Sequence, residues 1–199
     1  MKRKSKRKGR KGKILLLFIL IGIGLSLLFI FHQEIFNSLK PWLEKWSILE
    51  EKKGVFLYFS EREGEYLIGE KREILKRSEV KEEAKETIVE LIKGPKGKLI
   101  PTLPPQTKLL SLQFDEEGVA KVNFNKALSK DHPGGSSGEM MTVYSIVNSL
   151  TLNFPQIKRV QILIEGKAIE TIAGHLSLKQ PVSSNRELIK KMGKKRGND

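Results

Sequence analysis

The stretch that offers most to chemistry is rich in glycine and serine and covers residues 134–139, with the sequence GGSSGE. It holds two hydroxyl groups, those of Ser136 and Ser137, and it leads into an apolar pattern typical of a helix. A glycine-rich turn at a helix N-terminus exposes backbone N–H groups that can bind an anion. The stretch lacks the lysine–serine pair of a P-loop and the glycine spacing of a dinucleotide-binding turn. It is therefore the best candidate site in the sequence, but it lacks the pattern of a nucleotide-binding site.

Three interpretations of this stretch remain open. Ser136 and Glu139 have the spacing of a capping box, in which each side chain accepts from a backbone N–H of the other residue. The stretch can instead contact a partner or ligand. A nucleophilic serine is the third interpretation, but it needs a positioned histidine. His132 lies very near along the chain, and we expect His175 to close the domain through a hydrogen bond. The candidate contact residues are Gly135, Ser136, Ser137, Gly138, Glu139 and His175.

Other catalytic and metal-binding patterns are missing from the sequence. The chain has three scattered histidines and no cysteine, so no metal-ligand spacing is present. The missing cysteine also excludes disulfides, a thiol nucleophile and a lipid-modified N-terminal cysteine. No pair of acids stands out for acid–base catalysis. We therefore predict no catalytic residue, no metal and no cofactor, and we expect that the protein is not an enzyme.

A helix and a strand must position the candidate stretch. Apolar residues recur at helical spacing through residues 136–150, and Pro155 ends this helix because residues before a proline avoid the helical conformation. Residues 160–164 alternate as a covered strand. Strand and helix patterns also precede this unit. The strands are expected at 55–59, 66–74, 110–114, 120–124, 160–164 and 168–172, and the helices at 80–91 and 136–150.

The predicted order of elements is ββαββαββ. Hairpins followed by helices favour an α+β fold, which we expect to be one layered domain with a mostly antiparallel sheet and two helices on one face. The loops at 96–105 and 125–138 are the expected contact surfaces, because loops on a rigid layer commonly carry recognition.

The N-terminal region has the pattern of a membrane anchor. The net charge of +14 is concentrated at the ends, since the first thirteen residues hold nine bases and no acid. Residues 14–31 then form an apolar run of about 27 Å as a helix, which is near the thickness of a bilayer core. A basic tail can bind nucleic acid, but next to an apolar run it is more typical of a cytoplasmic flank. A cleaved signal peptide is disfavoured because no small-residue exit follows.

These patterns divide the chain into five parts. We expect a single-pass signal anchor with the N-terminus in the cytoplasm, a stalk with interfacial Trp42 and Trp46, and an extracytoplasmic domain. The parts are a basic cytoplasmic tail at 1–13, a transmembrane signal anchor at 14–31, a juxtamembrane stalk at 32–53, the folded domain at 54–182 and a basic flexible tail at 183–199.

Several sequence blocks, in the same order, resemble the GerMN domain family. They are LIPTLPPQTKLLSL at 99–112, GSSGEM at 135–140, TVYSIVNSL at 142–150, FPQIKRVQILIEG at 154–166 and AGHLSL at 173–178. The resemblance covers residues 54–181, and the family is named for proteins of spore formation and germination. It implies a fold and a setting at the cell envelope, where the domain acts through protein contacts at the membrane, and it implies no reaction.

The sequence thus favours a membrane-anchored binding or scaffold protein in sporulation, spore germination or cell-envelope assembly. Its expected partners are the membrane and other envelope or sporulation proteins, with no nucleic acid. A module that binds an envelope polymer, such as peptidoglycan or an anionic polymer, is the alternative, because a basic C-terminal tail can associate with polyanions. A cell-wall enzyme is a third hypothesis, which the missing catalytic pattern disfavours.

Overall fold

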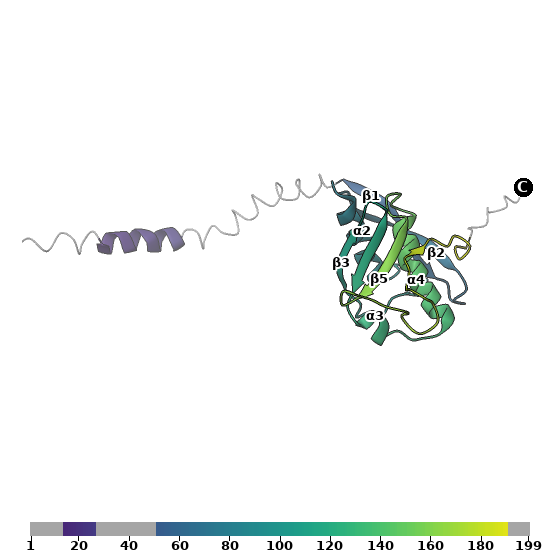
Figure 1. The fold of residues 1–199 in the computed structure, drawn as a ribbon. Coiled ribbons are helices and arrows are strands. Elements are labelled where there is room, and N and C mark those ends of the chain that lie inside the picture. Colours follow the sequence, from purple (N-terminus) through teal and green to yellow (C-terminus); the bar gives the residue numbers. More distant parts are fainter. Residues whose placement is uncertain (1–13, 27–50, 191–199) are drawn as a thin grey trace, which may run out of the picture. The chain divides into compact units, whose positions relative to one another are not determined.

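The computed structural model describes residues 14–26 and 51–190, which belong to two separate compact units (Figure 1). In the first unit, residues 14–26 are helical and most of their large apolar side chains are exposed. Within the described residues, we find no helix that is both long enough and apolar enough to span a bilayer. The rest of the predicted anchor, at 27–31, lies outside the described residues, as do the tail at 1–13 and most of the stalk.

The second unit, from residue 51 onward, contains the folded domain. It alternates hairpins and helices in nearly the predicted order. Its elements are β1 (Lys52–Ser60), β2 (Leu67–Leu75), α2 (Val80–Ile92), β3 (Leu109–Phe114), β4 (Val119–Phe124), α3 (Ala127–Lys130), α4 (Ser136–Thr151), β5 (Arg159–Ile164), β6 (Lys167–Ala168) and β7 (Val182–Ser183).

The strands form two sheets, which corrects the prediction of a single sheet. The β1–β2 hairpin is an antiparallel sheet of its own, and the second sheet has the order β3-β4-β5-β6 with β7 also paired to β5. In the larger sheet β3 and β4 are antiparallel, but β4 and β5 are parallel. The connection from β4 to β5 runs through α4, and such a crossover returns the chain in its original direction. The α+β class is confirmed.

The helices α2 and α4 pack against strands of both sheets. α2 packs against β3 and α4 against β5, and the helices also contact each other. The hairpin contacts both helices, with β1 beside α4 (Figure 1). Burial of apolar surface among these layers is the main force that holds them together. The core draws on both sheets and both main helices, and its largest fully buried side chains include Phe59, Phe124 and Phe154.

Three local predictions need correction. The strand expected at 168–172 shortens to β6, because the chain beyond it bends into a loop that is bonded to α4. The predicted loop at 125–138 contains the short helix α3. The basic tail expected from residue 183 is packed against the domain as far as Lys190. There, β7 pairs with β5, and Leu67 of β2 exchanges backbone hydrogen bonds with Leu188 and Lys190.

Candidate functional site

Glu139, in the first turn of α4, is a fully buried carboxylate. Its Oε1 accepts hydrogen bonds from the backbone N–H groups of Ile172 at 2.7 Å and Ala173 at 3.0 Å. Its Oε2 accepts from the N–H groups of His175 at 2.7 Å and Leu176 at 3.3 Å. Burial acts to raise the pKa of Glu139, but the four N–H donors outweigh burial and lower it. Glu139 therefore fixes the loop at 172–176 onto the start of α4 as an ion.

This geometry shows that the predicted capping box is wrong. The N-cap residue of α4 is Gly135, and no side chain caps the helix. Glu139 cannot turn back towards Ser136 because its carboxylate is occupied by the loop at 172–176. Gly135 has φ 83° and ψ 144°, a conformation that only glycine adopts at low cost. The glycine rather than the serine therefore sets the start of the helix.

The structure brings only part of the candidate set together. Gly135, Ser136 and Ser137 are exposed at the N-terminus of α4, and Gly138 is half-buried. His175 is exposed and joins the set through its backbone N–H, which donates to Glu139. The expected closing hydrogen bond thus comes from the backbone of His175. Whether these residues contact a partner remains a prediction.

A second polar cluster surrounds His132, and the sequence patterns did not predict it. The Nδ1 atom of His132 accepts from the N–H of Gly134 at 3.0 Å, so the ring proton lies on Nε2, which donates to Thr142 Oγ1 at 3.0 Å. Thr142 in turn donates to the backbone oxygen of Thr102 at 2.5 Å. Burial lowers the pKa of His132, against the opposing effect of the Glu139 charge. The neutral ring therefore links the loop at 125–138 to α4, and Thr142 links α4 to the loop that contains Thr102.

The cluster continues to the hairpin. Thr102 Oγ1 lies 2.6 Å from Ser145 Oγ, and Ser145 donates to the backbone oxygen of Tyr58 at 2.6 Å. Hydrogen bonds thus join the two loops that the sequence predicted as contact surfaces, 96–105 and 125–138. The two loops meet at one end of the domain, around the N-terminal half of α4.

One signal in the sequence could have revealed this cluster. α4 carries small polar residues at Thr142, Ser145 and Ser149, but it contains no lysine or arginine and only one acid, Glu139. A helix face in contact with water usually carries charged residues. A polar face without charges therefore indicates that the face is buried and hydrogen-bonded, as the structure shows.

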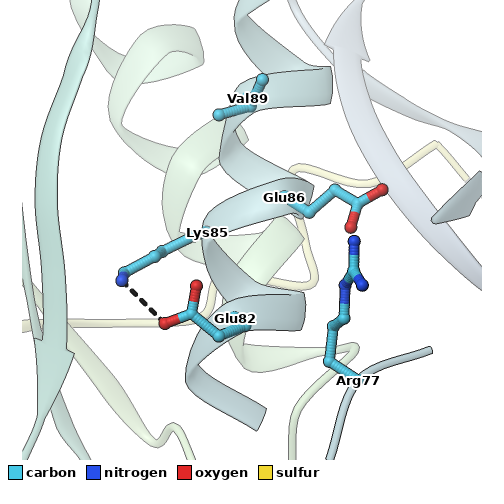
Figure 2. A pocket seen from close by; sticks show the side chains of 5 residues that line it. All are labelled: Arg77, Glu82, Lys85, Glu86 and Val89. Atoms are coloured by element: carbon cyan, nitrogen blue, oxygen red, sulfur yellow. Dashed lines mark hydrogen bonds and ion pairs between the residues drawn. The ribbon is translucent and has the colours of Figure 1, made fainter. Parts of the chain in front are cut away.

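A hollow on the outer side of α2 is the site drawn in Figure 2. Lys85 pairs with Glu82 at 2.8 Å, and Arg77 and Glu86 point towards one another (Figure 2). Glu86 also accepts from the backbone N–H of Leu75 at 3.0 Å, and Val89 completes the lining. The Lys85–Glu82 pair stabilises the surface of α2, and the bond from Leu75 to Glu86 stabilises the junction of α2 with β2. Across residues 14–26 and 51–190, no group of three or more acids and histidines is placed to hold a metal ion.

Comparison with known proteins identifies related domains. The family model Germane, described as sporulation and spore germination, matches residues 56–170. No curated protein sequence matches the chain.

Solved structures from two organisms are similar to the domain. A protein of Clostridium perfringens described as a lipoprotein is 27% identical, with a TM-score of 0.49, over 68% of this chain and 89% of its own. The tandem GerMN domains of the sporulation protein GerM from Bacillus subtilis are 24% identical with a TM-score of 0.54, and the match covers 71% of this chain and 49% of that one. The first GerMN domain alone is 18% identical with a TM-score of 0.54, over 66% and 97% of the two chains. At these identities the two GerM structures show a shared fold.

Proposed function

The chain belongs to the Germane family of sporulation and spore germination proteins, and on this premise we propose that it is a membrane-anchored, extracytoplasmic scaffold. In this proposal, the domain binds other proteins of the envelope during sporulation, spore germination or envelope assembly. It acts by binding and not by catalysis.

The observation that carries the proposal is how the polar groups of the candidate site are used. The carboxylate of Glu139, the ring of His132 and the hydroxyl of Thr142 are each engaged in hydrogen bonds within the domain. These bonds fix two loops side by side and form one rigid surface. Pre-organised surfaces favour binding because fewer groups lose freedom when a partner arrives.

Anchoring is supported by the N-terminal sequence. The helical residues 14–26 expose apolar side chains along their length, and the sequence stays apolar to Phe31. The nine bases before residue 14 favour an N-terminus inside the cell and a domain outside it. A reporter that is active only outside the cytoplasm should work when fused after Asp199. A reporter that is silent there and active before Met1 would reverse the topology.

The contact surface is tested by substitutions at exposed loop positions. Ile100 is 43% exposed in one loop, and Asp131 is exposed in the other. We expect Ile100→Asp combined with Asp131→Lys to abolish complementation of spore formation or germination in cells that lack the protein, while the melting temperature stays within a few degrees. Lys167→Glu, an exposed change on β6, is the matched control. Normal complementation by the loop variant would contradict the proposed contact surface.

A further inference from the structure

The two faces of the β1–β2 hairpin differ in how deeply their side chains are buried. Val55, Leu57 and Phe59 are fully buried on the inner face. Side chains alternate along a strand, so Phe56 and Tyr58 point to the opposite side. Phe56 pairs with Lys71 and Tyr58 with Gly69. We call the surface formed by Phe56, Tyr58, Gly69 and Lys71 the outer hairpin face.

The outer hairpin face presents its aromatic rings on a fixed backbone. A Cβ added to Gly69 would lie 3.3 Å from Tyr58 Cε1 and 3.4 Å from Phe56 Cδ1, so both rings lean over the glycine. Phe56 is nevertheless 47% exposed. Asn153 and Ser149 of the α4 region hydrogen-bond the backbone of these two residues. The face is therefore an apolar platform that cannot easily fold away from water.

Positive charge borders this platform. Lys71 is exposed and lies across Gly54, with its Cε 3.1 Å from the position of an added Cβ. Arg186 is exposed on the C-terminal segment, next to Asn185, whose backbone N–H donates to Asn148 of α4 at 3.0 Å. Burial raises the pKa of Tyr58, and the positive charge of Arg186 opposes this rise. The acid Glu73 is paired with Lys52 at 3.4 Å. Among residues 51–190, neither Lys71 nor Arg186 makes an ion pair. The exposed Glu187 follows Arg186, so the bases Lys52, Lys71 and Arg186 exceed the acids Glu73 and Glu187 by one.

Chain connectivity places both ends of the domain at this hairpin. The chain enters β1 at Lys52, within the last two residues of the predicted stalk. It leaves beside β2, where Leu67 is bonded to Leu188 and Lys190. The predicted membrane anchor and the basic C-terminal residues therefore both connect to the hairpin.

We propose that the outer hairpin face, together with Arg186, docks onto an anionic lipid surface. The inference rests on the proposed anchoring, which keeps a bilayer close to β1. Aromatic side chains favour the membrane–water interface, and basic side chains are attracted to anionic headgroups. Docking would hold the domain in one orientation at the membrane.

The experiment uses residues 51–199 as a soluble protein. The buried core cluster runs from Val55 to Leu178, and Val182 packs against it, so all of the core lies inside this piece and we expect the piece to fold. Both tryptophans of the chain lie before residue 51, so Phe56→Trp places a single fluorescent reporter on the face. Leu110→Trp on β3, where the native residue is 49% exposed, is the matched control. The probes are vesicles of phosphatidylcholine with or without phosphatidylglycerol, with bromine on the lipid acyl chains.

We expect the vesicles with phosphatidylglycerol to quench the reporter at position 56 and to leave the reporter at 110 unquenched. Lys71→Glu with Arg186→Glu should weaken vesicle binding at least about tenfold, since each base contributes to the attraction. The circular dichroism and the unfolding curve of this variant should match those of the parent. A matched piece that ends at Lys190 lacks the last nine residues and should still be quenched.

Several results would overturn the proposal. They are the absence of binding at low salt, equal quenching at both positions, and complete loss of binding in the piece that ends at Lys190. Tight binding to soluble polyglutamate or wall polymer without acyl-chain quenching would assign the face to an acidic partner instead. The vesicle assay tests lipid docking and does not depend on the membrane topology, whereas the reporter fusions test only the anchor. A failure of the docking proposal can therefore be distinguished from a failure of the proposed anchoring.

Discussion

Asn153 and Phe56 are joined by both ends of one carboxamide group. Asn153 Oδ1 accepts from the N–H of Phe56 at 2.9 Å, and its Nδ2 donates to the Phe56 oxygen at 2.7 Å. A neighbouring strand would supply the same two partners. The side chain of Asn153 thus replaces a strand at this position on the free edge of β1.

Hydrogen bonds also close this edge at Tyr58 and at Ser60. Ser149 and Ser145 bond the N–H and the oxygen of Tyr58, and Ile100 exchanges two backbone hydrogen bonds with Ser60. Open strand edges invite pairing with other chains. Side chains of α4 therefore both attach the hairpin to the domain and protect its edge.

The first prediction concerns Asn153→Ala. It removes both partners of Phe56, but water can replace them in part, so we expect a loss of about 1 kcal/mol in the free energy of unfolding. Urea unfolding of residues 51–199 measures this loss, and hydrogen exchange at the Phe56 amide should become faster. Thr151→Ala is the control, because Thr151 bonds only Val147 within α4. Unchanged exchange at Phe56 would refute the role assigned to Asn153.

The second prediction separates the two residues at the start of α4. Ser136 is exposed and caps nothing, so Ser136→Ala should change the free energy of unfolding by less than about 0.5 kcal/mol. Gly135→Ala should cost about 1–3 kcal/mol, because φ 83° strains a residue with a Cβ. Thermal or urea unfolding of both variants tests this order. A larger loss for Ser136→Ala than for Gly135→Ala would restore the capping box.

Local patterns in the sequence predicted most elements of the fold. Hydrophobic periodicity marks α2 and α4, because each has a buried apolar stripe, and it marks the hairpin strands for the same reason. The division into two sheets was not predictable in this way. It depends on which side chains close the edge of β1, and Asn153 lies 97 residues from its partner Phe56.

The hydrogen bonds of the candidate residues were not predicted from the sequence. The sequence indicated Glu139, Ser136 and His175 as neighbours of interest, and Glu139 does hold His175. The prediction that Glu139 bonds the backbone N–H of Ser136 was wrong. A carboxylate binds whichever N–H groups the fold brings nearest, and here these belong to residues 172–176. Spacing along one helix cannot report such a distant loop.

The third prediction concerns the pH dependence caused by His132. Burial lowers its pKa in the folded domain, whereas the unfolded chain takes up a proton near pH 6.5. The stability that the neutral ring contributes is therefore present above about pH 6.5 and is lost as the pH falls through the lower, folded pKa. Urea unfolding from pH 7.5 to 5.5 should show a decline that is absent in His132→Gln. Equal slopes for the two proteins would contradict the buried neutral ring.

The last prediction concerns Glu139, whose removal leaves four backbone N–H groups without their acceptor. Hydrogen bonds to a charged group are worth about 1.5–3 kcal/mol each at most, and they are not additive. We expect Glu139→Ala to cost about 3 kcal/mol or more at pH 7. Glu139→Gln should cost less, because its amide oxygen still accepts from one pair of donors. Glu117→Gln, on an exposed turn, is the control and should be neutral.

Glu139 should also dominate the pH dependence of stability in the acid range, because its pKa is lowered in the folded domain. The unfolded carboxyl takes up a proton near pH 4.3. The stability that Glu139 contributes is thus complete above that pH and is lost as the pH falls through the folded pKa. The difference in unfolding free energy between the parent domain and Glu139→Gln should therefore narrow from pH 5 to pH 3. Repulsion among the positive charges at low pH acts in both proteins, so it largely cancels when the two unfolding free energies are subtracted. A gap that stays constant across this range would mean that Glu139 is not held as an ion by the loop at 172–176.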